Sequence, residues 1–281
     1  MERNPYDKVL EQLKEYCDYY NIPLKHIFTI MSDVKVIPMI RGKGFEFIIS
    51  DMLKTILSTD EWEVSNPNIN AQSEVHDVDV YVTRIKDKKQ VRIECKLSKK
   101  DSFRINENSP AISVKCMRSR TLSDNEMATR MARRYGVDRQ QVLAHADNYR
   151  EGDFDFVVTS LGNAFWDTKE SMYVFAGSAE QLKILAELFP DRFSEKYSTD
   201  DFKKETFGFL LFSHSKNLSV KPENKITCTR RKCIQSGNSE NCGFIPNYPL
   251  IHLKDLLEGN SSWKPINEIE KALNNFLDKR S

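Results

Sequence analysis

The sequence predicts an α/β fold in which a central mixed β-sheet is flanked by helices and extended by further C-terminal elements. Two patterns support this fold: apolar residues recur every three to four positions in several segments, and short runs between them alternate apolar with polar residues. Strands interleaved with helices form layered α/β domains. The composition of the 281 residues, 40% hydrophobic and 30% charged, excludes a disordered chain and a membrane protein.

Helices are expected where the apolar spacing is sustained over two turns or more. Asn21-Ile22-Pro23 ends the first of these segments, and an SDNE capping-box pattern begins a later one. Strands are expected where the sequence is short, apolar and bounded by turn residues. The expected helices are residues 6–20, 42–57, 123–150 (one piece through MATRMARRYG and then a second helical piece), 178–189 and 266–279, and the expected strands outside the hairpin described next are 154–159, 173–175 and 207–212.

A β-hairpin is expected over residues 77–96, because two alternating runs are separated by a polar turn at 86–89. Cross-strand pairing in such a hairpin would bring Asp79 beside Glu94. The predicted apolar face consists of Val78, Val80, Val82, Val91, Ile93 and Cys95, and the opposite face carries Asp77, Asp79, Glu94 and Lys96.

The polar face of this hairpin has the chemistry of a metal-dependent hydrolase. Two neighbouring carboxylates repel each other, and a divalent cation with a preference for oxygen ligands, such as Mg²⁺ or Mn²⁺, relieves that repulsion. Lys96 is placed to orient or deprotonate a water molecule, and such a site suits hydrolysis of a phosphodiester. The alternative is a solvated strand face with cross-strand charge pairs. The valine-rich strands look central, however, and four ionisable groups would be hard to solvate there.

At these residues the chain resembles the PD-(D/E)xK nuclease superfamily, which includes most type II restriction endonucleases. Asp79 matches the first acid, and Glu94-Cys95-Lys96 matches the E-x-K element. Glu46 lies in the helix 42–57, where members of the superfamily often carry a further acid. The order of elements also matches, and the resemblance covers residues 40–160.

The resemblance implies a restriction-endonuclease-like core and Mg²⁺-dependent cleavage of DNA, with Mn²⁺ as a substitute. Asp79, Glu94 and the backbone carbonyl of Cys95 would hold the metal. Lys96 would activate the attacking water, and Glu46 would support the site, although an exposed helical glutamate is an equally good interpretation of Glu46. Val78 precedes Asp79, which the family pattern accepts, and Asp77 offers a competing register for the first acid.

Basic residues follow the E-x-K strand directly. Between residues 99 and 139 ten basic residues face five acids, a local net charge of +5 against +1 for the whole chain. Residues 221–232 form a second run with a net charge of +4. Such patches bind DNA phosphates, although a solvated charged surface is the alternative. The residues expected to contact double-stranded DNA are Lys99, Lys100, Arg104, Lys115, Arg118, Arg120, Arg230 and Arg231.

Three of the six cysteines lie close together in the sequence, at Cys228, Cys233 and Cys242. They could supply three zinc ligands, with His252 or His214 as the fourth, since structural zinc takes four ligands in a tetrahedron. The spacing lacks a tight Cys-x2-Cys pair, so three reduced thiols in a loop are the alternative.

The sequence as a whole therefore predicts a Mg²⁺-dependent endodeoxyribonuclease, most simply a homodimeric type II restriction enzyme. A repair, recombination or mobile-element nuclease of the same superfamily and a non-catalytic DNA-binding module are the alternatives. Residues 1–200 are expected to hold the nuclease core with its N-terminal helices, and 201–281 a C-terminal extension for DNA recognition, unless the two form one domain. No secretory signal or apolar span is visible, so a cytoplasmic protein is expected.

Overall fold

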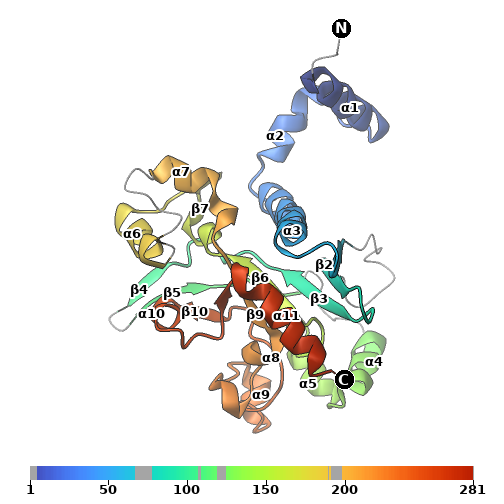
Figure 1. The fold of residues 1–281 in the computed structure, drawn as a ribbon, viewed down its shortest axis with the longest axis vertical. Coiled ribbons are helices and arrows are strands. Elements are labelled where there is room, and N and C mark those ends of the chain that lie inside the picture. Colours follow the sequence, from blue (N-terminus) through green and yellow to red (C-terminus); the bar gives the residue numbers. More distant parts are fainter. Residues whose placement is uncertain are drawn as a thin grey trace.

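The computed structural model describes residues 5–66, 78–106, 109–118, 125–188, 190 and 198–280. Its centre is a six-stranded mixed sheet with the order β1-β2-β3-β6-β9-β11 (Figure 1). The pairing of β3 with β6 is parallel, and the other neighbours in this sheet are antiparallel. The strands are β1 (Trp62–Ser65), β2 (Val80–Arg84), β3 (Gln90–Cys95), β6 (Phe156–Ser160), β9 (Leu210–His214) and β11 (Lys264–Pro265).

Two long helices cover one face of the central sheet, α3 (Ile37–Ile56) and α11 (Ile269–Asp278). The helices present apolar residues at helical spacing, and the strands present every second residue, so the two sets meet in one core. This core contains Phe45, Ile49 and Leu53 of α3, Leu273 and Leu277 of α11, and Val80, Val82, Val91 and Ile93 of the hairpin.

A second core lies on the opposite face of the sheet, around Val157, Leu161 and Leu211. A small sheet of order β10-β5-β4 supplies Ile112 and Ile251 to this core. Glu94 alternates with Ile93 and Cys95 along β3, so its side chain points toward this second core rather than toward α3. The strands of the small sheet are β4 (Arg104–Asn106), β5 (Ser109–Ser113) and β10 (Leu250–His252), and a separate hairpin pairs β7 (Trp166–Lys169) with β8 (Met172–Phe175).

The remaining helices lie around this framework, and α1 and α2 extend away from it (Figure 1). They are α1 (Pro5–Tyr19), α2 (Ile27–Met31), α4 (Asn125–Tyr135), α5 (Arg139–Ala144), α6 (Ala179–Leu188), α7 (Thr199–Lys204), α8 (Ser215–Leu218), α9 (Arg231–Gln235) and α10 (Leu253–Leu257), with 3₁₀ turns η1 (Leu24–His26), η2 (Leu161–Phe165), η3 (Thr206–Gly208), η4 (Pro222–Asn224) and η5 (Ile266–Glu268). No helix in the described ranges is long and apolar enough to cross a membrane.

The mixed α/β fold, the hairpin and most of the expected helices are present, with some differences in their bounds. α3 begins at Ile37 rather than at residue 42. Of the two helical pieces expected within 123–150, α4 ends at Tyr135, where Gly136 adopts a φ of 63°, and α5 ends at Ala144 rather than at residue 150. The strand expected at 207–212 begins at Leu210, because residues 206–208 form η3. The boundary expected at residue 200 divides one sheet, since β9 and β11 lie in the same sheet as β3.

Candidate active site

The centre of the predicted site lies where β2 begins and β3 ends. Val80 pairs with Ile93 in the antiparallel register, so Asp79 and Glu94 occupy the next facing positions. The backbone N–H of Cys95 donates to Oδ2 of Asp79 over 2.7 Å, which fixes the Asp79 carboxylate against the end of β3. The competing residue Asp77 lies outside the described residues.

Glu94 is buried, and two groups converge on one of its oxygens. The Nζ of Lys96 lies 2.5 Å from Oε1 of Glu94, and the hydroxyl of Tyr149 donates to the same oxygen over 2.7 Å. Lys96 also lies over the Tyr149 ring, with 5.4 Å between Nζ and the ring centroid. A buried carboxylate needs such partners, because leaving it unpaired would cost several kilocalories per mole. Tyr149 lies in the loop before β6, and no sequence pattern marked it as part of the site.

The charges at this site shift the pKa values of its members. Burial, and then the charge of Glu94, raise the pKa of Asp79 well above its ordinary value, while Lys96 acts in the opposite direction. Burial, the largest single effect, lowers the pKa of Lys96, but the charges of Glu94, Tyr149 and Asp79 and the hydrogen bond to Glu94 together raise this pKa well above its ordinary value. The site therefore has a buried carboxyl group at Asp79 whose ionisation is disfavoured, and a lysine that is held in its charged form.

Glu46 lies on α3, which packs against β2 and β3. Its side chain is 18% exposed and pairs with Lys43 at 2.5 Å. Its charge contributes to raising the pKa of Asp79, after the larger effects of burial and of Glu94. Glu46 is thus a partly buried acid near Asp79, which differs from the freely exposed helical glutamate of the alternative interpretation.

The donor set suits a hard divalent cation better than a softer metal. The candidate ligands are the carboxylates of Asp79 and Glu94, both oxygen donors of the kind that hard divalent cations prefer. The pKa of Asp79 is raised first by burial and then by the charge of Glu94, and a bound cation would offset both effects. The thiol of Cys95 is not suited to this role, because burial and then the charge of Asp79 raise its pKa well above its ordinary value. Its main-chain carbonyl is the group from Cys95 that suits a metal of this class.

A buried network holds the loop that carries Tyr149. Arg118 is 2.5 Å from Asp153 Oδ2 and donates from Nε to the carbonyl of Asn148 over 2.7 Å. Tyr135 of α4 donates to the same Asp153 carboxylate over 2.6 Å. Arg118 was expected to contact DNA, and this expectation is wrong: its side chain is only 5% exposed and serves the interior.

The other basic residues after β3 are on the surface. Lys99, Lys100, Arg104 and Lys115 are exposed, whereas Arg120 lies outside the described residues. The main chain brings Lys99 and Lys115 to neighbouring segments, since Lys99 N donates to Ser113 O over 2.7 Å and Lys115 N to Leu97 O over 3.1 Å. Arg104 is paired with Asp101, and Lys100 donates to Thr168 Oγ1 over 2.6 Å.

The second basic run, residues 221–232, also contains one arginine with an internal partner and one that is exposed. Arg230 is partly buried and lies 2.6 Å from Asp147, so its guanidinium group already has an internal partner. Arg231, the first residue of α9, is exposed. Of the two, Arg231 is the residue that is open to a ligand.

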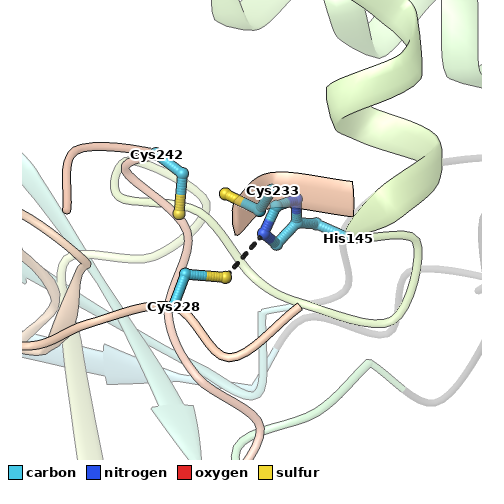
Figure 2. A group of neighbouring side chains, drawn as sticks. All are labelled: His145, Cys228, Cys233 and Cys242. Carbon is cyan, nitrogen blue, oxygen red and sulfur yellow. Dashed lines mark hydrogen bonds between the residues drawn. The ribbon is translucent and has the colours of Figure 1, made fainter. Parts of the chain in front are cut away.

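The three clustered cysteines do meet in space, but the histidine beside them is His145. The ligand atoms of His145, Cys228, Cys233 and Cys242 all lie within 4.8 Å of one another. Figure 2 shows the four side chains gathered around one point. His252 was expected as the fourth ligand, and this is wrong, because His252 pairs with Ala111 in the small sheet and is exposed. His214 ends β9 and accepts a hydrogen bond from Lys216 N. His145 lies 83 residues before Cys228 in the sequence, so its role was not visible there.

A hollow of about 660 Å³ lies elsewhere, between α11 and the ends of β6 and β9. Asp155, Phe156, His214 and Phe276 line it, together with charged residues of α11. It contains none of the predicted catalytic residues, and it lies on the opposite face of the sheet from Tyr149 and Glu94. We therefore assign the candidate chemistry to the hairpin rather than to this hollow.

Comparison with known proteins gives no further guide: no family model, no curated protein and no solved structure matches the chain. The functional argument therefore depends on the geometry of the site alone.

Proposed function

We propose that the protein is a divalent-cation-dependent nuclease that hydrolyses phosphodiester bonds in double-stranded DNA. One observation carries the proposal: Asp79 and Glu94 occupy facing positions of a buried hairpin, and Lys96 contacts Glu94 at 2.5 Å. Two acids and a lysine in this arrangement match the resemblance to the PD-(D/E)xK superfamily. The order of elements supports the same comparison: α3, β1, β2 and β3 are followed by the short strands β4 and β5, by α4 and α5, and then by β6, which is parallel to β3.

Each side chain has a separate role in this proposal. Asp79, Glu94 and the carbonyl of Cys95 would hold Mg²⁺ or Mn²⁺, which, when bound, supplies positive charge to the scissile phosphate and lowers the pKa of the attacking water. Lys96 would orient that water. Neutralising the charge of Glu94 would weaken the main interaction that keeps Lys96 protonated. Lys96 would then release its own proton to solvent, and the neutral amine would accept one from the attacking water. Glu46 and Tyr149 would position the acids, Tyr149 through its hydrogen bond to Glu94.

The surface beyond Lys96 suits a DNA backbone. The chain continues from Lys96 to the exposed Lys99 and Lys100, and Lys115 lies on the adjoining segment. Lysines in a line from the catalytic strand can follow consecutive phosphates, which positions the duplex without reading its sequence. Arg231 would contribute to the same interaction only if the DNA reached α9.

We further propose that the enzyme acts as a homodimer of the type II restriction class. A palindromic site has two-fold symmetry, and a two-fold dimer places one catalytic site on each strand. The extended α1 and α2 expose large apolar side chains that a second copy of the chain could cover. These side chains include Tyr6, Val9, Leu10, Tyr16, Phe28, Ile30 and Met31.

The test is cleavage of a long duplex of varied sequence by the purified full chain, with Mg²⁺ and with EDTA. Asp79→Asn and Lys96→Met are the test variants. Asp51→Asn and Lys54→Met are their controls, because these residues form an exposed ion pair on α3. We expect discrete, metal-dependent fragments that both test variants abolish and both controls retain. Cleavage that survives Asp79→Asn and Lys96→Met, or that proceeds in EDTA, would contradict the proposal.

The same preparation tests the dimer. Light scattering during size-exclusion chromatography gives the mass in solution, and a mass near twice 32.7 kDa is expected. A monomer that remains monomeric on DNA with a cleavable site would contradict the restriction-enzyme form of the proposal. That result would not bear on the proposed hydrolysis of DNA, which the cleavage assay tests separately.

A further inference from the structure

Four buried side chains with zinc-binding atoms meet at one point, away from the candidate nuclease site (Figure 2). They are His145, Cys228, Cys233 and Cys242, and none is more than 6% exposed. Their ligand atoms lie within 4.8 Å of one another. A tetrahedral zinc ion with Zn–S distances of about 2.3 Å places its sulfurs about 3.8 Å apart. The cluster is therefore within about 1 Å of the geometry that zinc requires.

The histidine is oriented as a zinc ligand is. Its Nδ1 lies 2.9 Å from the carbonyl of Gln141, and its Nε2 faces Cys228 Sγ at 3.2 Å. Zinc-bound histidines almost always donate their second ring N–H to a carbonyl or carboxylate, which fixes the tautomer and aims the other nitrogen at the metal. The ring also stacks on Phe244 at 4.2 Å, which fixes its plane.

The three sulfurs are available as ligands, and one of them has a backbone donor. All three cysteines are free, so none is committed to a disulfide. Arg230 N–H donates to Cys228 Sγ over 3.5 Å, the type of contact that stabilises charge on a metal-bound sulfur. Three sulfurs and one imidazole form a soft donor set that selects zinc over Mg²⁺. We propose that these four residues bind one structural Zn²⁺ ion per chain, and that this ion fixes the segment that carries Tyr149.

The four ligands come from separate parts of the chain, which a bound ion would hold together. His145 follows α5, whereas Cys233 lies in α9 and Cys228 and Cys242 lie in the segments on either side of it. The ion would therefore join parts of the chain 83 or more residues apart. Few other apolar residues pack there: the local core contains Val220, Phe244 and the three cysteines. A metal can supply the stability that so small a core lacks, because its binding free energy becomes folding free energy.

The segment that begins at His145 also contacts the hairpin of β2 and β3. Four residues after His145, the hydroxyl of Tyr149 donates to Glu94. Between them, Asp147 pairs with Arg230 at 2.6 Å, and Asn148 donates to the carbonyl of Ile245 over 2.8 Å. The ion would have four protein ligands and no open position, so it would act on structure and not on the reaction.

The first experiment uses the full wild-type chain, purified without chelator or added metal. Elemental analysis is expected to give one zinc per chain. Absorption at the zinc K-edge is expected to give three sulfurs near 2.3 Å and one nitrogen near 2.0 Å, as about the distances of such sites. Absence of zinc, an oxygen-rich shell, or a disulfide among the three cysteines would overturn the proposal. This measurement does not depend on any variant being folded.

Variants then test which residues bind the ion. Cys233→Ser and His145→Ala are expected to lose zinc, whereas Cys17→Ser and His252→Ala should keep it. Cys17 is equally buried but lies on α1, and His252 is the histidine that the structure places in the small sheet. If the ligand variants do not fold, Co²⁺ exchanged into the wild-type protein provides the readout, through its tetrahedral thiolate absorption. Zinc retained by folded His145→Ala would exclude His145 as a ligand.

Hydrogen exchange tests the effect on Tyr149. Removing zinc from the full chain with a chelator is expected to speed amide exchange in residues 139–150 and 226–244, and to leave β3 unchanged. Unchanged exchange in 139–150 would show that the ion does not fix that segment. These readouts do not involve DNA cleavage, so they are independent of the proposed nuclease activity.

Discussion

The hydroxyl of Tyr149 donates to Glu94 Oε1 over 2.7 Å, and Lys96 contacts that same oxygen. The E-x-K glutamate is thus held by a residue that lies 55 positions further along the chain. Tyr149 itself is held by the buried Arg118–Asp153 pair and packs edge-on against Phe154 at 5.2 Å. The orientation of a candidate metal ligand therefore depends on the loop before β6, which is also where the proposed zinc site is anchored.

The first prediction concerns this hydrogen bond. Tyr149→Phe retains the ring and removes the donor to a buried carboxylate, so we expect the free energy of unfolding to fall by about 1–3 kcal/mol. The Mg²⁺ concentration needed for half-maximal cleavage should rise, because Glu94 loses a group that orients it. Urea denaturation and metal titration measure the two effects. Tyr248→Phe is the control, since the Tyr248 hydroxyl contacts only Met117 Sδ, at 3.6 Å, among the bonds described.

A Tyr149→Phe variant with unchanged metal dependence would contradict the positioning role. If Tyr149 had a structural role alone, Tyr149→Phe would lower the free energy of unfolding and leave the Mg²⁺ concentration for half-maximal cleavage unchanged.

The second prediction concerns Asp79, whose pKa is raised by burial and then by the charge of Glu94. The folded protein therefore binds this proton more tightly than the unfolded chain does. Stability falls as the pH rises from the unfolded pKa of about 3.9 toward the raised folded value. Asp79→Asn removes this cost and can still accept the hydrogen bond from Cys95 N. We expect a variant that is inactive yet more stable than wild type at pH 7.

Urea denaturation between pH 3.5 and 8, conditions chosen to span about the unfolded pKa, checks the sign. The stability advantage of Asp79→Asn should grow with rising pH and vanish at the acidic end. Asp51→Asn on the exposed face of α3 is the control, for which no such trend is expected. With Mg²⁺ added, the melting temperature of wild type should rise and that of Asp79→Asn should not. If Asp79→Asn were less stable than wild type at every pH, ionisation of Asp79 would not be destabilising the folded protein.

The third prediction concerns the Glu94–Lys96 pair. Lys96→Met leaves Glu94 buried without its cation, and breaking a buried pair in this way costs about 3–5 kcal/mol. Glu94→Gln in the same chain removes the orphaned charge, so the double variant should recover most of that loss. The cycle is measured by urea denaturation at neutral pH without divalent cations. Additive effects of the two substitutions would mean that the two charges do not interact in solution.

The sequence allowed the hairpin and its acids to be predicted because their pattern is local. Period-two alternation in two adjacent runs places Asp79 opposite Glu94 in any hairpin of that register, and the structure has that register. The same reasoning predicted α1, α3 and α11, whose apolar spacing is long and regular. Short strands such as β1 and β11 have only four and two residues, too few for a period to be seen.

The rest of the site is formed by contacts between distant parts of the chain. Tyr149 and His145 come from a loop that looked like the end of a helix, and their partners lie 55 and 83 residues away. In the sequence Arg118 looked like the exposed Lys115, because a basic residue in a basic segment does not reveal whether a buried acid will pair with it. Asp153, which is fully buried, supplies that acid.

The last prediction concerns the proposed DNA surface. If Lys99 and Lys115 each contact a phosphate, Lys99→Ala/Lys115→Ala should lower the slope of log K against log salt by about 2, because each contact releases about one counterion. Affinity should fall alike for all duplex sequences, since phosphate contacts carry no sequence information. Binding is best measured in the Asp79→Asn background, which prevents cleavage. Lys271→Ala/Lys279→Ala removes the same charge from α11 on the other face of the sheet, so it should leave the slope unchanged. Equal slopes for both double variants would mean that the duplex does not follow the segments after Lys96.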